Sequence, residues 1–187
     1  MLIEFNQFPT KQKKLQKFIV RRTKDHMAYQ RLTRQNIDEF KSLIKKLEPD
    51  SQRLWGALNQ NGVLTHLCRT FEMSNGSFDP GDESNFITRL KLFRIVIFKY
   101  MPWPKGKIKA PDNLTPEPEN DFDQERERLF ELMDEFIEKL ESNPEATGKS
   151  PVMGDIPLSF WSVMHGRHTC WHLEQFSIDS SKLGGKA

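Results

Sequence analysis

The 187-residue sequence has few of the features that mark secreted or membrane proteins. It contains only two cysteines, Cys68 and Cys170, which are too few for the disulfide framework of a small secreted domain. Its longest apolar stretch, residues 92–103, is interrupted by Arg94 and Lys99 and is too short to span a bilayer. The N-terminus has no basic segment before an apolar run, so it does not resemble a signal peptide. These absences predict a soluble, cytoplasmic protein.

Common catalytic and binding motifs are missing as well. The sequence has no P-loop, no glycine fingerprint for dinucleotides and no Ser-His-Asp set. No stretch alternates polar and apolar residues for long enough to demand a β-sheet. The net charge of +2 is too small to indicate nucleic-acid binding by itself. The function must therefore be sought in a less standard group of residues.

Charge is unevenly distributed along the chain. Residues 10–46 contain twelve Lys or Arg and three acids, whereas residues 113–145 contain twelve acids and three Lys or Arg. Either these segments are solvated helix faces of opposite sign that lie near each other, or they bind a partner and support a homodimer. An RNA- or membrane-associated protein that uses the basic residues 11–34 is a less favoured alternative, and the few aromatic residues interleaved there for stacking argue against single-strand binding. We therefore expect a homodimer, with no nucleic-acid partner and no membrane partner.

Hydrophobic periodicity predicts an all-α fold. Apolar residues recur at helical spacing, between capping residues, prolines and glycines, in residues 11–22, 33–47, 63–73, 86–100, 123–141 and 157–178. Residues 101–112 are rich in proline and predict a surface connector. Four main helices with additional helical material favour a bundle. We expect a single domain over residues 1–178, in which residues 1–32 form an N-terminal extension, and a disordered tail at 179–187.

The last predicted helix contains three of the five histidines. Each helical residue advances by ~100°, which places five residues on one stripe of this helix: Trp161, His165, His168, His172 and Phe176. His168 and His172 have the i, i+4 spacing that lets two imidazoles reach one ion. Two histidines do not complete a metal site, so a third ligand must come from another part of the chain.

His66 is the candidate third ligand, because it lies near the apolar face of the helix predicted over residues 63–73. Three neutral imidazoles with open positions make a catalytic-type site for a borderline metal such as Zn(II) or Ni(II). Cys68 and Cys170 are poor candidates, since each lies two residues from a histidine and so ~200° around its helix. The alternative is a satisfied, partly buried His66 and a chance histidine pair on the last helix.

Two segments of the sequence resemble a DinB-like family of uncharacterised bacterial proteins. Residues 151–176 resemble the family's C-terminal signature, and six of them match its pattern: Trp161, His168, His172, Leu173, Gln175 and Phe176. Residues 55–69, W-G-A-L-N-Q-N-G-V-L-T-H-L-C-R, resemble the family's upstream motif, and His66 matches its helix-two histidine. The resemblance covers roughly residues 50–178.

The resemblance implies an up-and-down four-helix bundle, with extra helical or loop material at the N-terminus and between helices two and three. It also implies a divalent metal held by His66, His168 and His172. In the wider superfamily such sites support transfer or isomerisation with low-molecular-weight thiols such as bacillithiol or mycothiol. A metal there would lower the pKa of the thiol and present a thiolate nucleophile to a small-molecule substrate. The implied activity is a metal-dependent thiol transferase.

A competing hypothesis is a non-enzymatic bundle that acts in a stress response through binding, with a structural or vestigial histidine set. The sequence also departs from the family's pattern at two positions. Trp171 stands where the family often has the first of two adjacent histidines, and Gly166 stands where it often has a tyrosine. The chain offers His165 on the same stripe instead. This residue is either a fourth ligand, a general base or a pocket-lining group, or it is simply a packed histidine.

Five further side chains near these histidines each have two interpretations. Gln175 either forms a hydrogen bond with a ligand imidazole or packs on the helix surface. Trp161 and Phe176 either fill the core or line the wall of a pocket. Arg69 and Arg167 either hold an anionic substrate or form surface ion pairs.

Overall fold

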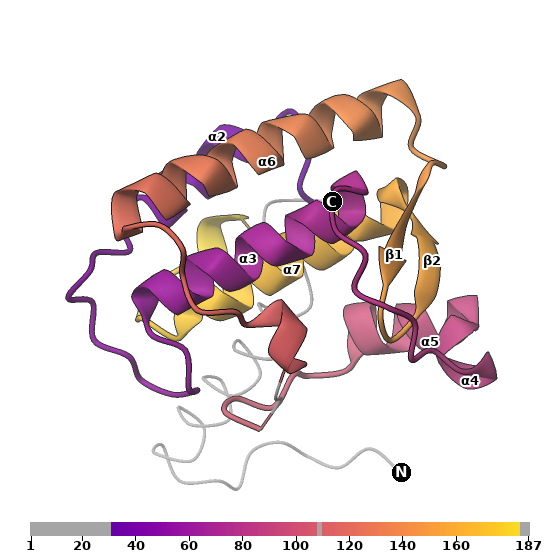
Figure 1. Cartoon of the computed structure of the whole chain (residues 1–187), viewed down its shortest axis with the longest axis horizontal. Helices are drawn as coiled ribbons and strands as arrows, with labels where there is room; N and C mark the ends of the chain where they lie inside the picture. Colours follow the sequence, from indigo (N-terminus) through magenta and orange to yellow (C-terminus); the bar gives the residue numbers. More distant parts are fainter. Residues whose placement is uncertain (1–30, 108–109, 184–187) are drawn as a thin grey trace, which may run out of the picture.

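The chain is mostly helical in the computed structural model, which describes residues 31–107 and 110–183 (Figure 1). Its longest helices are α2 (Ile37–Ile44), α3 (Gln60–Asn75), α6 (Phe122–Ser142) and α7 (Leu158–Glu174). These four correspond to four of the segments predicted from periodicity, so the helical class is confirmed. The helix predicted over residues 11–22 lies outside the described residues.

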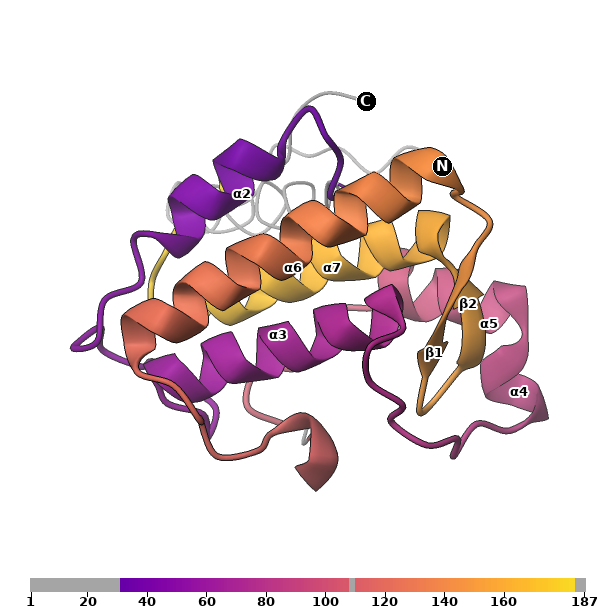
Figure 2. The same cartoon turned by 45° about the horizontal axis from the view of Figure 1, so that its top comes forward.

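Helices α3, α6 and α7 lie side by side, and α2 packs on α6 (Figures 1 and 2). The core between them is formed by large apolar side chains that are almost fully buried, among them Phe40, Leu64, Phe71, Leu129, Met133, Phe136 and Trp161. Burying each such side chain contributes roughly 1.5–3 kcal/mol. The packing of α3 against α7 determines which side chains meet between these two helices.

Local sequence explains where the helices begin and end. The Asn59 side chain accepts a hydrogen bond from the Gly62 amide at the start of α3, and Gly76 ends that helix with φ +80°. Asp121 and Gln124 form a capping box at the start of α6. Asp121 therefore fixes the start of α6.

A short β-hairpin corrects the all-α prediction. Strand β1 (Thr147–Ser150) pairs with β2 (Gly154–Pro157) in an antiparallel register that places Thr147 opposite Pro157. Each strand has only four residues, which is too short for alternation to be recognised in the sequence. Gly148 is required in β1, because a Cβ there would collide with the backbone of Ser74. The hairpin therefore packs closely against the end of α3.

The single helix predicted over residues 86–100 is divided into three pieces. Helix α4 (Phe86–Arg89) is followed by α5 (Lys91–Ile95) and by a π-helix, η1 (Val96–Tyr100). The break lies at Leu90, whose backbone is extended, with φ −65° and ψ 128°. No proline or glycine stands there, so the sequence carried no signal for the break.

Two other segments are packed more closely than expected. The 3-10 helix η3 (Ser181–Leu183) lies in the predicted disordered tail, but Leu183 is buried in the core. Leu183 therefore packs on the helical core, and residues 184–187 lie outside the described residues. After the proline-rich connector, the 3-10 helix η2 (Asp112–Leu114) carries Leu114 into the core. The connector thus reaches the interior at its end.

The basic and acidic segments meet within one molecule where both are described. Lys41 of α2 pairs with Asp134 of α6 at 2.6 Å, and Arg34 pairs with Glu141 at 3.0 Å. These contacts match the interpretation of two helix faces of opposite sign that lie near each other. Such pairs near the surface contribute little to stability, because water and salt screen them.

Within residues 31–107 and 110–183, no helix has both the length and the apolar character needed to cross a bilayer.

Candidate metal centre

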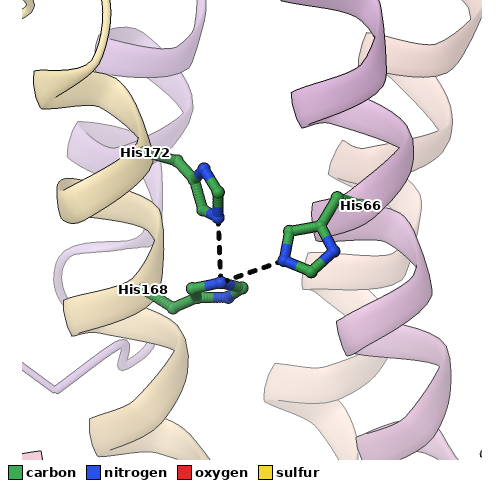
Figure 3. A group of neighbouring side chains, drawn as sticks. All are labelled: His66, His168 and His172. Carbon is green, nitrogen blue, oxygen red and sulfur yellow. Dashed lines mark hydrogen bonds between the residues drawn. The ribbon is translucent and has the colours of Figure 1, made fainter. Parts of the chain in front are cut away.

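Three histidines from two helices converge in the interior between α3 and α7. Figure 3 shows His66 of α3 facing His168 and His172 of α7. One ring nitrogen from each residue lies within 4.8 Å of the other two. The structure therefore brings together the three residues that the sequence predicted as ligands. In the described part of the chain, this group includes no cysteine or carboxylate.

The nitrogen atoms that converge are the Nε2 atoms. His66 Nε2 lies 3.2 Å from His168 Nε2, and His172 Nε2 lies 2.9 Å from the same atom. For an ion bound by imidazoles at ~2.1 Å with tetrahedral angles, neighbouring nitrogens are about 3.4 Å apart. The two observed spacings are close to that value, so the three rings are already grouped at the scale of a coordination sphere.

The other ring nitrogens of two of these histidines are held by oxygen acceptors. His66 Nδ1 donates to the Leu114 carbonyl at 2.7 Å, and His172 Nδ1 donates to Gln175 Oε1 at 2.6 Å. These oxygens have no hydrogen to give, so each Nδ1 must carry the proton. In a neutral ring the Nε2 lone pair is then free to bind a metal, which is the usual arrangement of metal-binding histidines.

Burial keeps the three rings neutral. It lowers the pKa of His66, with partial compensation from the hydrogen bond to Leu114. Burial and the nearby His66 lower the pKa of His172 to about 3. Burial also holds the pKa of His168 well below its ordinary value, and the neighbouring histidines add to this effect. Neutral imidazole is the form that binds a metal.

The three Nε2 atoms share too few hydrogens to satisfy one another, and this arrangement suits a bound cation. His66 and His172 both present bare Nε2 lone pairs to His168 Nε2. A neutral His168 carries at most one hydrogen on that nitrogen, and one hydrogen cannot lie along two N···N contacts. At least one contact thus brings two nitrogens together with no hydrogen between them. A bound divalent cation would satisfy all three lone pairs, so the residues fit a metal.

Gly56 and Trp55 fix the orientation of Gln175. The Gln175 Nε2 atom faces the Trp55 carbonyl at 3.4 Å, which leaves Oε1 for His172. Gly56 has φ +85°, and a Cβ at this position would collide with Gln175 Nε2. Gln175 is 3% exposed, which excludes the surface interpretation. Its observed contact is the expected hydrogen bond to the imidazole of His172, one of the three candidate ligands.

Three tryptophans pack beside the histidine group. Trp171 lies edge-on to His172 with ring centroids 4.9 Å apart, and Trp103 lies 6.1 Å from His168. The ring of Trp55 contacts the ring of Trp171, with their centroids 4.5 Å apart. His66 and His172 are buried, while His168 is partly exposed. The side of the group near His168 is therefore the one closest to solvent.

His165 lies in the aromatic core, outside the three-histidine group. Its ring stacks on Phe71 with centroids 3.8 Å apart, and it also stacks on Trp161 at 5.2 Å. Its Nε2 atom forms a hydrogen bond with Ser74 Oγ at 2.8 Å. Burial lowers the pKa of His165 to about 3. Of the interpretations offered by the sequence, a packed histidine describes these contacts.

The remaining candidate residues have identifiable contacts. Trp161 is buried in the core and donates to the Gly148 carbonyl at 3.2 Å. Phe176 also belongs to the core. Arg69 forms an ion pair with Glu72 at 2.9 Å. Trp161 and Phe176 are therefore core residues, and Arg69 forms an ion pair, as one of the two interpretations of each residue predicted.

Arg167 differs from both of its predicted roles, because it is buried and not on the surface. Its guanidinium donates to the carbonyls of Ile97, at 2.9 Å, and Met101, and it stacks over Trp103 at 4.5 Å. Arg167 precedes His168 in α7. It therefore joins α7 to the π-helix η1 and to Trp103.

Sequence reasoning missed the groups that orient the ligands. The Leu114 carbonyl cannot be recognised in a sequence, because any residue has one. Gly56 was recognisable only as part of the W-G-A-L motif, in which a glycine suggests a special backbone conformation. Cys68 and Cys170 are buried and free, and neither joins the histidine group, as expected.

Comparison with known proteins adds little to the geometry. No family model matches the chain, and no solved structure matches it. A curated relative, the piRNA biogenesis factor prde-1 of Caenorhabditis elegans, is 27% identical over 107 residues. That similarity covers 57% of this chain and 18% of the relative, so the chain matches less than a fifth of that protein's length. A similarity of this extent does not transfer the relative's role.

Proposed function

We propose that this chain is a divalent-metal-binding protein with a DinB-like four-helix-bundle fold. The proposal rests on one observation: His66 and His172 use Nδ1 for hydrogen bonds to Leu114 and Gln175, and turn Nε2 toward His168. Ordinary core histidines have no need to converge in this way, because each can find its own acceptor. The resemblance of residues 55–69 and 151–176 to the DinB-like pattern supports the same ligand set.

The fold assignment draws on the four main helices. Helices α2, α3, α6 and α7 pack around one core, and the ligands come from α3 and α7. Helix bundles build metal sites in this manner, from side chains on facing helices. The material between α3 and α6, which includes α4, α5 and the connector, corresponds to the insertion expected between the second and third helices of the bundle.

Three neutral imidazoles suit Zn(II) or Ni(II), both borderline metals that accept nitrogen ligands. A site with three protein ligands keeps an open position, which is the pattern of a catalytic centre. When bound, such a metal would supply Lewis acidity that lowers the pKa of a coordinated thiol. The chain's own residues supply the ligands, hold their rings through Leu114 and Gln175, and limit access of water through the tryptophans.

We further propose that the activity is a thiol-dependent transfer to a small-molecule substrate. The partly exposed side at His168 offers the approach to the open position. Cobalt-loaded protein tests this step, because a thiolate bound to Co(II) adds an intense charge-transfer band in the near ultraviolet. Titration with a low-molecular-weight thiol should produce the band in the wild type but not in His168→Ala. A cobalt spectrum that does not respond to thiols would contradict the transferase proposal and leave metal binding intact.

The second candidate is a structural metal site in a non-enzymatic bundle. Its support is the aromatic packing, since Trp171 is 8% exposed and lies against His172, while Trp103 lies against His168. This candidate predicts a cobalt spectrum without response to thiols, together with a large loss of stability on chelation. Light scattering of the full chain at several salt concentrations tests the proposed homodimer separately, because it measures the molar mass in solution.

A further inference from the structure

The segment that contains α4, α5 and η1 exposes an unusual amount of apolar surface. Five large side chains are exposed within residues 86–96: Phe86 at 79%, Ile87 at 60%, Leu90 at 42%, Leu92 at 72% and Val96 at 39%. We call these five residues the α4–α5 face. Single exposed apolar residues are ordinary, but a concentrated set marks an interaction surface. The histidine site does not use any of these side chains.

Local contacts order the segment that carries the α4–α5 face, and two residues after Leu90 join it to the rest of the protein. Asn85 forms a capping box at the start of α4. Arg89 pairs with Asp82 at 2.7 Å, and Arg94 donates to the Met153 carbonyl at 2.8 Å. On the inner side, Phe98 is buried in the core. The apolar side chains are therefore exposed on a segment that Arg94 and Phe98 attach to the core.

The shape of this surface is protruding. Phe86, Ile87 and Leu92 keep 60–79% of their area in contact with solvent. Side chains that line a groove are more enclosed than this, because the walls of the groove cover part of them. Figures 1 and 2 both place α4 at the outer edge of the molecule, beyond the β-hairpin. Protruding apolar side chains suit insertion into a soft apolar phase better than capture of a peptide.

The charge of the segment favours an anionic phase. Residues 86–101 contain four basic residues, Arg89, Lys91, Arg94 and Lys99, and no acid. Of the nearby acids, Asp82 pairs with Arg89 and Asp79 pairs with Lys149 at 2.9 Å, while Glu83 is exposed beside the segment and Asp155 lies near Arg94. Lys91 is exposed among the apolar side chains. Apolar residues interleaved with Lys and Arg are the pattern of helices that lie in a membrane interface.

We propose that the α4–α5 face docks the protein on the surface of a bilayer that contains anionic lipids. Phe86, Ile87 and Leu92 enter the boundary between headgroups and acyl chains, and Lys91 faces the headgroups. This differs from the sequence-based expectation of no membrane partner, which considered spanning segments and residues 11–34 but not this face. The proposal is independent of the histidine site and of any metal.

Flotation of the full chain with lipid vesicles tests the proposal. Binding should be strong with phosphatidylcholine vesicles that contain phosphatidylserine and weak with phosphatidylcholine alone. The double variant F86S/L92S should bind at least about tenfold more weakly, because two large apolar side chains no longer insert. Lys91→Glu should weaken binding several-fold, and added salt should weaken wild-type binding.

Leu54→Ser is the matched control, because Leu54 is 61% exposed but lies outside the α4–α5 face. It should bind vesicles like the wild type. Circular dichroism and metal content should be unchanged in all these variants, which separates docking from folding. Absence of flotation with any vesicle, or flotation that F86S/L92S does not reduce, would overturn the proposal. A dimer in sedimentation equilibrium that F86S/L92S dissociates would also overturn it and would assign the face to a second copy.

Discussion

Gln175 connects His172 to the backbone of a distant loop. Its Oε1 atom accepts the hydrogen on His172 Nδ1 at 2.6 Å, and its Nε2 atom faces the Trp55 carbonyl at 3.4 Å. Because the carbonyl can only accept, the amide has one favourable orientation. Gln175 therefore determines which nitrogen of His172 is free for a metal.

Gln175→Leu should weaken metal binding by about 10–100-fold, because His172 loses the acceptor that fixes its tautomer and ring orientation. The measurement is a competition titration of the purified protein against a chromophoric chelator. Gln35→Leu is the control, since Gln35 is exposed and lies outside the site. Equal affinity in Gln175→Leu and the wild type would show that the hydrogen bond does not support the ligand.

Gly56→Ala should weaken metal binding by displacing Gln175, since the added Cβ would occupy the position of its amide nitrogen. Gly81→Ala is the control for backbone strain, because it adds a Cβ at a similar positive φ without displacing a neighbouring side chain. Gly81 has φ +81°, similar to the +85° of Gly56, but a Cβ there meets no atom within 4 Å. Both variants should lose about 1 kcal/mol or more of stability. Only Gly56→Ala should lose metal affinity, and a loss in both variants would contradict this explanation.

His165→Gln should leave the metal affinity unchanged, because His165 stacks on Phe71 and Trp161 and lies outside the ligand group. The variant keeps a donor for Ser74 but loses the ring contacts, so we expect a loss of about 1–3 kcal/mol in the free energy of unfolding. His168→Gln should abolish metal binding. Denaturant unfolding and metal titration of both variants check the prediction. Loss of metal from His165→Gln would make His165 part of the site.

The stability of the metal-free protein should depend on pH. The pKa values of His165 and His172 are about 3 in the folded protein, against 6.5 for an ordinary histidine. The unfolded chain then binds more protons between these values, so each histidine's contribution to stability is complete above about pH 6.5. That contribution is lost progressively as the pH falls toward 3.

Denaturant unfolding at a series of pH values measures this effect. The free energy of unfolding of the metal-free wild type should fall between pH 6.5 and pH 3. His165→Gln has one fewer such group, so its free energy should fall less steeply over the same range. Equal slopes in the two proteins would show that His165 titrates normally in the folded state.

The sequence predicted the features that depend on local spacing. The recurrence of apolar residues located α2, α3, α6 and α7; α2 and α6 each bury one stripe, whereas most residues of α3 and α7 are buried. His168 and His172 were recognisable as a pair from their i, i+4 spacing. His66 lay on a different helix, so its approach to the pair depended on how α3 packs against α7. The resemblance to the DinB-like pattern supplied that relationship at the sequence level.

Other features depended on tertiary contacts that leave no local pattern. The carbonyl of Leu114 holds His66 only because the connector returns to α3 at this point. Leu183 is buried although its neighbours are small or polar, so composition predicted a disordered tail there. The break at Leu90 and the four-residue strands of the hairpin are equally invisible to a periodicity argument. Each of these features depends on packing between residues that are far apart in the sequence.

We propose above that His66, His168 and His172 together bind one divalent metal. The most direct measurement is X-ray absorption spectroscopy of the purified full chain, combined with its metal content. We expect one Zn(II) or Ni(II) per chain, with a first shell fitted by three imidazoles and one or more lighter ligands, and no bound metal in His168→Ala. A chain that takes up no stoichiometric metal from solutions of either ion, or that binds equally well after His168→Ala, would contradict the account.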